Sequence, residues 1–353
     1  MTDMMNVNPL MDFARKTECS VKIPSQGLWY DDDAIEFNAI GEVDIMPMLP
    51  NDEMKIVNPE SLISGDAIIS VIKSCCPGIK RPEELYYPDV NVLLLGIRKA
   101  TYGDEISQQY ICPMCWSKKS DIEIAEYERL IKEKSLEKTV LDRNDAEIIK
   151  KEAEKVSTPI IADLEKQGKI LITPQEIKLS IDAVLARMIN LPSNPYVQAK
   201  NGLKIYVTPY KCSDKIKFTA QQIKYQKITK FYEKEGKDIE LMDDKQLTPE
   251  YLDKIDRMLD MYADVSSSLV DIIAMSIRKI ELPNGEVVDN KQFIYEYIKN
   301  CDVELVNQLK DKIDELNSCG VQQTIPCECP CCGHKWNEKF YGFNQSDFFG
   351  IGS

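Results

Sequence analysis

Two short cysteine motifs constrain the fold of this chain more than any other feature. Cys112-Pro113-Met114-Cys115 lies in the first third of the sequence, and Cys329-Pro330-Cys331-Cys332-Gly333-His334 lies near its end. Each Cys-Pro-x-Cys turn directs two sulfurs to one side of the backbone, so two such turns complete a tetrahedral site of four thiolates. We therefore predict one structural zinc ion per chain, bound by Cys112, Cys115, Cys329 and Cys332.

The second motif contains more cysteines than one site needs, so Cys327 or Cys331 is an alternative to Cys329 or Cys332. We prefer Cys329 and Cys332 because their spacing repeats the first motif and places Gly333 where a left-handed turn residue is useful. Reduced buried cysteines without metal, and an iron–sulfur cluster, are the other interpretations of four clustered cysteines. Aromatic residues follow both motifs, as in the short strands that flank a zinc ribbon: Trp116, Trp336, Phe340 and Tyr341.

The sequence contains no recognisable constellation of catalytic residues. The chain has 353 residues and a single histidine, His334, which lies inside the second cysteine motif. This excludes a Ser-His-Asp triad, a Cys-His nucleophile outside that motif and any two-histidine metal site. The sequence also lacks a phosphate-binding G-x-x-x-x-G-K-[ST] loop and a G-x-G-x-x-G turn. We therefore predict a protein that is not an enzyme.

The charge balance disfavours one candidate function that cysteine motifs of this kind suggest. This candidate is a zinc-ribbon regulator that binds nucleic acid or the transcription machinery. The formal net charge is −14. Because a phosphate backbone repels an acidic protein that has no segregated basic face, nucleic acid is an unfavourable partner. No apolar run is long enough to span a bilayer, and Met1–Asn6 lacks the features of a signal peptide. We expect synthesis in a reducing cytoplasm, where cysteines bind metal more often than they form disulfides.

The chain is predicted to be a helix-rich α+β protein made of five successive segments. The N-terminal region is expected to have short strands, the middle and C-terminal parts to be helical, and the zinc ribbon to join both ends of the chain. The segments are a flexible arm (1–20), a region with the first cysteine motif (21–120), a charged helical insertion (121–200), a helical domain with a hairpin (201–320) and the second motif with the tail (321–353).

Hydrophobic periodicity and capping residues predict the individual elements. Helices are expected at 62–75, 88–100, 126–155, 174–189, 219–234 and 248–277. Strands are expected at 43–45, 120–124 and 203–207, with a hairpin at Asn284-Gly285. Asp289 and Asp302 are expected to cap two short helices, the second of which ends near Gly320.

Trp29 and Tyr30 follow a turn shaped by Pro24 and Gly27. Trp and Tyr are enriched among the residues that dominate protein interfaces. Large aromatic side chains can equally fill the core of their own domain. We therefore predict Trp29 and Tyr30 either as partner-binding residues or as core residues of their own domain.

A series of short motifs in a fixed order resembles a known family. It begins with Lys22-Ile-Pro-Ser-Gln-Gly-Leu-Trp-Tyr30 and the Met-Pro-Met-Leu-Pro-Asn-Asp-Glu stretch that ends at Glu53. It continues with Cys75-Cys76-Pro77, Asp89-Val-Asn-Val-Leu-Leu-Leu-Gly-Ile-Arg98, Ala100-Thr-Tyr-Gly-Asp104 and Cys112-Pro-Met-Cys115. Over about residues 20–118 the chain resembles the baseplate hub assembly (chaperone) and base plate proteins of T-even-type phages.

The resemblance implies a protein of a contractile-tail phage that is made in the host bacterial cytoplasm. It implies a role in building the baseplate hub, with other tail and baseplate proteins as partners. It leaves open whether the protein is an assembly chaperone that leaves or a structural subunit that stays in the virion tail baseplate. It supplies no catalytic residues.

Overall fold

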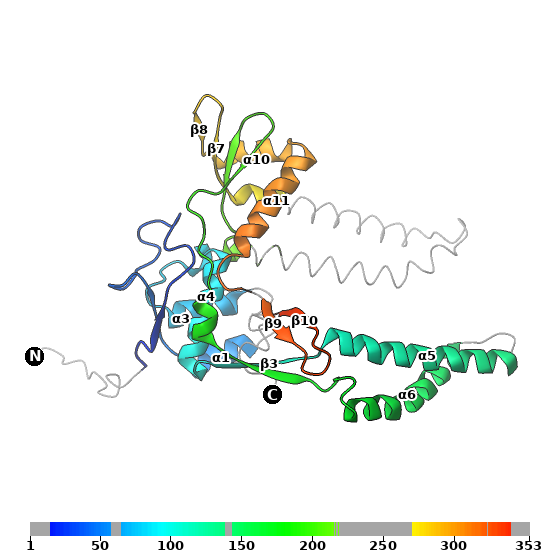
Figure 1. The fold of residues 1–353 in the computed structure, drawn as a ribbon. Helices are drawn as coiled ribbons and strands as arrows, with labels where there is room; N and C mark the ends of the chain where they lie inside the picture. The colour runs from blue at the N-terminus through cyan, green and yellow to red at the C-terminus, as the bar shows by residue number, and fades with distance from the viewer. Residues whose placement is uncertain are drawn as a thin grey trace, which may run out of the picture. The chain divides into compact units, whose positions relative to one another are not determined.

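The computed structural model describes residues 15–57, 65–137, 143–214, 216, 218, 270–322 and 324–339. These residues have an α+β fold with many helices and four small sheets of two to four strands, which confirms the predicted fold class (Figure 1). The chain forms two compact units, each assembled from segments that are distant in sequence. Unit 1 consists of residues 1–105, 180–322 and 342–353, and unit 2 consists of residues 106–179 and 323–341. The five segments expected from composition stay a prediction.

The N-terminal part of unit 1 is built around one almost fully buried helix, α4 (Tyr87–Tyr102). Every residue from Pro88 to Ile97 is buried, as expected for a segment that is apolar on all sides. Strands β1 (Cys19–Val21) and β2 (Val43–Ile45) pair antiparallel and pack on this helix. Gly96 permits the close approach, since a Cβ there would lie 2.2 Å from Ile45 Cδ1.

Three further helical elements complete this region: α1 (Pro50–Val57), α3 (Asp66–Cys75) and the 3₁₀ helix η2 (Pro82–Glu84). The predicted strand 43–45 and the helix predicted at 88–100 are confirmed. The helix predicted at 62–75 is confirmed from Asp66 onward, while 62–64 lie outside the described residues. Arg15 donates hydrogen bonds to Pro47 and Ser74, so the described end of the predicted arm is anchored.

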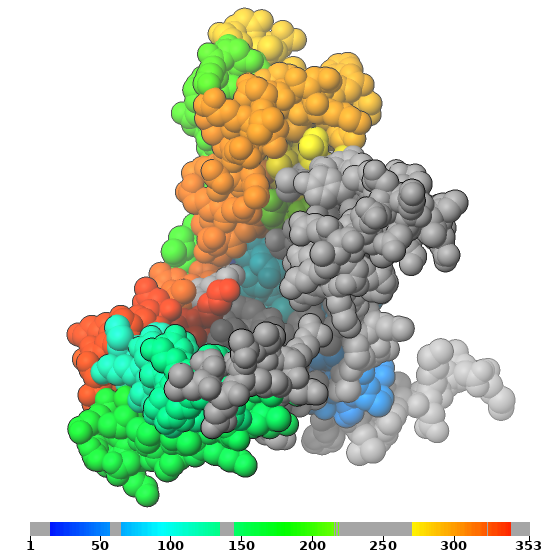
Figure 2. Space-filling model, turned by 90° about the vertical axis from the view of Figure 1, so that its right-hand side faces the viewer, coloured from blue at the N-terminus to red at the C-terminus, as the bar shows by residue number. Residues whose placement is uncertain are grey.

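The other part of unit 1 is a four-stranded antiparallel sheet with helices packed on it. Its order is β5 (Tyr196–Gln198), β6 (Lys204–Val207), β7 (Ile277–Glu281) and β8 (Val287–Val288). Helices α10 (Lys291–Lys299) and α11 (Val303–Asn317), orange in Figure 2, contribute buried residues to the core on one side of the sheet. The predicted strand 203–207 and the Asn284-Gly285 hairpin are confirmed, with Gly285 at φ 85°.

The two predicted N-caps have different outcomes. Asp302 caps α11 by accepting a hydrogen bond from the Leu305 N–H, as expected. The prediction for Asp289 is wrong by one residue, because Asn290 accepts from the first-turn N–H groups of α10. Gly320 lies shortly after the end of α11 with φ 84°, as predicted for the residue that ends this helix. The short helix α7 (Ile181–Leu185) also belongs to unit 1.

Unit 2 combines two long helices with two strand pairs. Helices α5 (Pro113–Glu137) and α6 (Arg143–Lys166) pack on each other. They confirm the helix predicted at 126–155 for residues 126–137 and 143–155, while 138–142 lie outside the described residues. Strand β3 (Glu105–Tyr110) pairs with β4 (Gln175–Ser180), and β9 (Thr324–Glu328) pairs antiparallel with β10 (Lys335–Lys339). Figures 1 and 2 both show the red β9–β10 hairpin beside the start of α5.

Two predicted elements are wrong. Residues 120–124 lie inside α5 and not in a strand, and the Lys119–Glu123 ion pair at 2.7 Å supports the helix there. The helix predicted at 174–189 begins instead as strand β4, because pairing with β3 outweighs the capping pattern after Thr173. Only residues 181–185 of that range are helical.

The remaining predicted elements lie wholly or largely outside the described residues. None of the helix expected at 219–234 is described. Of the helix expected at 248–277, residues 270–275 are described and helical, and Ile277 already begins β7. Among the described residues, no helix combines the length and apolarity needed to cross a membrane.

Candidate metal centre

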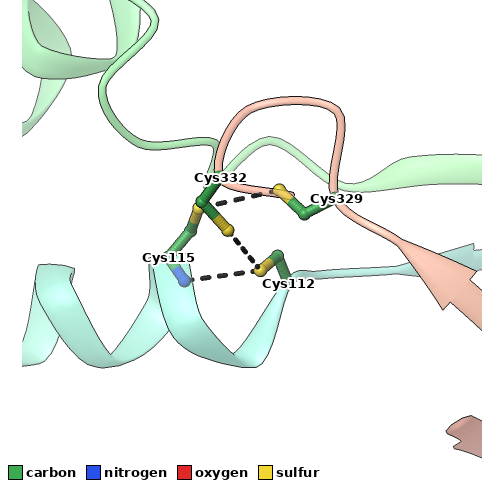
Figure 3. A group of neighbouring side chains, drawn as sticks. All are labelled: Cys112, Cys115, Cys329 and Cys332. Carbon is green, nitrogen blue, oxygen red and sulfur yellow. Dashed lines mark hydrogen bonds between the residues drawn. The ribbon is translucent and has the colours of Figure 1, made fainter. Parts of the chain in front are cut away.

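The four predicted cysteines meet in unit 2. Cys112 directly precedes α5 and Cys115 lies in its first turn, while Cys329 follows β9 and Cys332 lies in the turn before β10 (Figure 3). The four sulfurs all lie within 4.8 Å of one another. The Sγ atoms of Cys112 and Cys332 are 3.6 Å apart, and those of Cys115 and Cys329 are 3.8 Å apart. The cluster thus joins the middle of the sequence to its C-terminal region.

Local backbone structure explains how each motif directs its sulfurs. Pro113 occupies the first position of α5, where its missing N–H and fixed φ are tolerated. The helical turn that follows brings the Cys115 N–H to 3.5 Å from the Cys112 sulfur. In the second motif Gly333 has φ 68° and donates to the Cys329 carbonyl, which closes the turn. The left-handed role predicted for Gly333 is confirmed.

Burial and hydrogen bonding set the protonation of these thiols. Burial raises the pKa of Cys112 and of Cys115, since the thiolate loses its hydration. Burial also acts to raise the pKa of Cys329, but hydrogen bonds from the backbone N–H groups of Cys332 and Cys331 and from the Cys332 and Cys112 side chains together lower that pKa to about 7. The Cys329 thiol is therefore the easiest of these three to convert to the thiolate, which is the form that binds metal.

The geometry fits a single tetrahedral ion. Four sulfurs at about 2.3 Å from a central zinc would lie about 3.8 Å from one another. The two sulfur pairs at 3.6 and 3.8 Å agree with this spacing. A disulfide requires about 2.05 Å between sulfurs, and all twelve cysteines are free. A cluster of several irons needs wider separations than one ion, because the irons and bridging sulfides lie between the thiolates.

The centre has an apolar surrounding that limits access of water. Cys112, Cys115 and Cys329 are buried together with Ile161 and Ile170, and partly buried side chains such as Trp336 pack against them. The ring of His334 stacks on Trp336 at 5.7 Å between centroids, and His334 is not part of the four-sulfur group. The site therefore offers four thiolates and an apolar wall, as in closed structural metal sites.

The two alternative cysteines lie outside the group. Cys327 is buried in β9, where it pairs in register with Trp336 of β10. The Cys331 thiol donates to the Gly168 carbonyl at 3.1 Å. Strands flank the second motif as predicted, but Trp116 lies on α5, so the strand expected after the first motif is absent. Phe340 and Tyr341 lie outside the described residues.

Trp29 and Tyr30, predicted as interface or core residues, have defined contacts within unit 1. The Tyr30 hydroxyl donates to Asp89 Oδ2 at 2.7 Å and accepts from the Tyr86 N–H at 2.6 Å. The Trp29 ring meets the Tyr86 ring edge-on at 5.7 Å and packs against the core. Both side chains are partly buried, so these contacts support the core interpretation, and a partner-binding role stays a prediction.

The buried carboxyl of Asp89 was not predicted from the sequence. It lies in the first turn of α4 and also accepts a hydrogen bond from the Ser25 N–H at 2.9 Å. In the sequence, Asp89 appears only as the first residue of the Asp89–Arg98 motif. Nothing in that motif indicates whether its aspartate is buried or exposed.

Comparison with known proteins agrees with the resemblance found in the sequence motifs. A family model described as T4 bacteriophage base plate protein matches residues 22–164. The match extends past residue 118, where the motif resemblance ended, and includes α5 and almost all of α6. No match was found among curated proteins or solved structures. Over residues 22–164, this chain is similar to the T4 bacteriophage base plate protein family.

Proposed function

We propose that this protein acts in the assembly of a phage tail baseplate without catalysing a reaction, and that its cysteine centre holds a structural zinc ion. The observation that carries the proposal is the family match over residues 22–164. That segment contains the first cysteine motif and the helix pair of unit 2. The protein would act where other tail and baseplate proteins assemble, in the cytoplasm of the host bacterium.

The four-sulfur centre supports a structural role for the metal. Its donors are thiolates alone, and three of the four cysteines are buried. Catalytic zinc sites keep one position open for water or substrate, whereas four protein ligands close the coordination shell. Zinc would supply the positive charge that allows thiolates to lie less than about 4 Å apart. Elemental analysis of the purified chain should find about one zinc ion per chain.

Quantitative mass spectrometry of purified virions and of infected-cell lysate tests the assembly role. A structural subunit should be present in virions at a fixed ratio to other tail proteins. A chaperone should be abundant in lysate, should co-sediment with baseplate intermediates and should be missing from virions. A protein found in neither virions nor baseplate intermediates would refute the proposal.

A further inference from the structure

One face of the four-stranded sheet in unit 1 carries aromatic and cationic side chains close together. Alternation along β6 places Ile205 and Val207 in the core, so Lys204 and Tyr206 lie on the opposite face. The antiparallel register aligns Tyr196 and Lys279 with Tyr206 on that face. Tyr196 is 46% exposed, and its ring centroid lies 5.6 Å from that of Tyr206.

A β-bulge brings a second cation to the same place. Tyr206 pairs with Lys279 and Val207 pairs with Ile277, so Arg278 is an extra residue in β7. In a regular strand, consecutive side chains point to opposite faces, and one of the two cations would enter the core. Here Lys279 Nζ lies 4.6 Å from the Tyr206 ring centroid and Arg278 Cζ lies 6.0 Å from it. Neither residue is buried.

The aromatic surface continues from the sheet to the turn that carries Trp29. The Arg278 guanidinium also lies 5.8 Å from the centroid of the Trp29 ring, and it donates to Asn194 Oδ1. On the other side, Val287 of β8 faces the same way as Glu281 and is 48% exposed. We name this surface the Tyr–Arg face and define it by Trp29, Tyr196, Tyr206, Arg278, Lys279 and Val287.

Among the described residues, neither Arg278 nor Lys279 forms a close ion pair with a carboxylate, and Lys279 acts on Glu281 only through its longer-range field. The nearest acid on the face, Glu281, already accepts from Lys204 at 2.9 Å and from the Tyr206 hydroxyl at 2.9 Å. Although the chain has a net charge of −14, these two adjacent cations lie on one face without a close carboxylate. Tyr, Trp and Arg are also the residue types that contribute most binding energy at protein interfaces.

We propose that the Tyr–Arg face binds an acidic segment of a partner protein, whose carboxylates pair with Arg278 and Lys279 while its apolar side chains contact Tyr196 and Val287. Charge complementarity identifies the partner's chemistry. Single-stranded nucleic acid fits less well, because its bases need free ring faces on which to stack. Here the cations already lie over the rings of Tyr206 and Trp29, and Glu281 repels phosphate.

Fluorescence anisotropy with the purified full chain tests this inference independently of the proposed function. The probe is a labelled peptide of mixed glutamate and leucine. The comparison probes are the same peptide with lysine in place of glutamate, and an oligothymidine of equal length. We expect the acidic peptide to bind most tightly, and added salt to weaken it because exposed charges are screened.

The variants locate the binding surface. Arg278→Gln with Lys279→Gln should weaken binding of the acidic peptide by about tenfold. The control, Lys200→Gln with Lys312→Gln, changes the net charge equally but removes cations that pair with Glu304 and Glu315, and binding should be retained. Lys279→Glu alone makes the same test without loss of the Arg278 hydrogen bond, and circular dichroism verifies folding.

Three results would overturn the inference. These are no binding of the acidic peptide by the wild-type chain, equal binding by the wild-type and Lys279→Glu chains, and tighter binding of oligothymidine than of the acidic peptide. None of these results bears on the proposed function in baseplate assembly, which is tested separately with virions and infected-cell lysate.

Discussion

Replacement of Asp89 by asparagine should change the stability of unit 1 in a pH-dependent way. Asp89 is fully buried, and its carboxylate accepts from the Ser25 N–H and the Tyr30 hydroxyl. Burial raises the pKa of Asp89 from 3.8 to about 6, although both hydrogen bonds oppose the rise. The titratable groups that face it are the Tyr30 and Tyr86 phenols, and burial raises the pKa of both, so neither ionises near neutral pH.

The direction of the pH effect follows from where the proton is held more tightly. The folded state binds the Asp89 proton more strongly than the unfolded state, so ionisation of Asp89 destabilises the fold. A pKa of about 6 in place of 3.8 corresponds to a cost of about 3 kcal/mol that is fully present well above pH 6. This cost disappears as the pH falls from above 6 toward 4. Between pH 7 and pH 5 the wild-type chain should regain about 1.3 kcal/mol from this group.

The asparagine side chain does not titrate, so the Asp89→Asn variant lacks this contribution. The new amide still offers an oxygen to the Ser25 N–H but leaves the Tyr30 proton without its acceptor, at a cost of about 1 kcal/mol that does not change with pH. The free energy of unfolding of wild type minus variant should therefore be larger at pH 5 than at pH 7, by about 1.3 kcal/mol. Other titrating groups cancel in this difference because both chains contain them.

Hydrogen exchange of the α4 amides measures the difference at the helix that carries Asp89. A comparison of the two chains at each pH removes the intrinsic pH dependence of exchange. The variant Tyr30→Phe provides a second, independent test. It removes a hydrogen bond that lowers the pKa of Asp89, so its cost should be larger at pH 7 than at pH 5. A difference between wild type and Asp89→Asn that is equal at both pH values, or larger at pH 7, would refute the reasoning.

Three further predictions concern the metal centre and the packing of unit 1. Cys329→Ser should abolish zinc binding and unfold unit 2, whereas Cys327→Ser should retain about one zinc per chain; equal loss in both variants would show that the assigned ligands are wrong. Gly96→Ala should lower stability by about 1–3 kcal/mol in a thermal melt, because its Cβ would overlap Ile45; an unchanged melting temperature would contradict this contact. Asp302→Ala should lower the free energy of unfolding by about 1 kcal/mol because α11 loses its cap, and Asp302→Asn should lower it much less. Chemical denaturation can compare the two variants, and equal losses would contradict a capping role.

The elements that could be predicted from the sequence are those whose local pattern agrees with their final environment. The α4 segment is apolar on all sides, and the structure buries it on all sides. The spacing of the second cysteine motif repeated that of the first, and the structure brings Cys329 and Cys332, not Cys327 or Cys331, to the first pair. In both cases the local sequence already contained the information that decides the structure.

The errors arise where partners distant in sequence decide the structure. The capping pattern after Thr173 is a valid helix start taken alone, but pairing with β3 makes residues 175–180 a strand. The alternation at 120–124 is equally valid for a strand, but these residues continue the helix that begins at Pro113. The bulge at Arg278 has no local pattern at all, because it depends on the register between β6 and β7.

The length of chain between the two cysteine motifs determines how much a shared metal ion would stabilise unit 2. Cys115 and Cys329 are separated by 214 positions. A cross-link that closes a loop of this length removes conformational entropy from the unfolded chain worth about 5 kcal/mol. Within unit 2, the β9–β10 hairpin has a small apolar interface with the segment 106–179, centred on the cysteines themselves. Because a two-stranded hairpin is at best marginally stable alone, the ion is the main contribution that would hold residues 323–341 in this unit.

Removal of zinc by a chelator should therefore increase hydrogen exchange in β9 and β10 before it does so in the buried helix α4 of unit 1. Simultaneous loss of protection in both units would show that the metal stabilises the whole chain and not unit 2 alone.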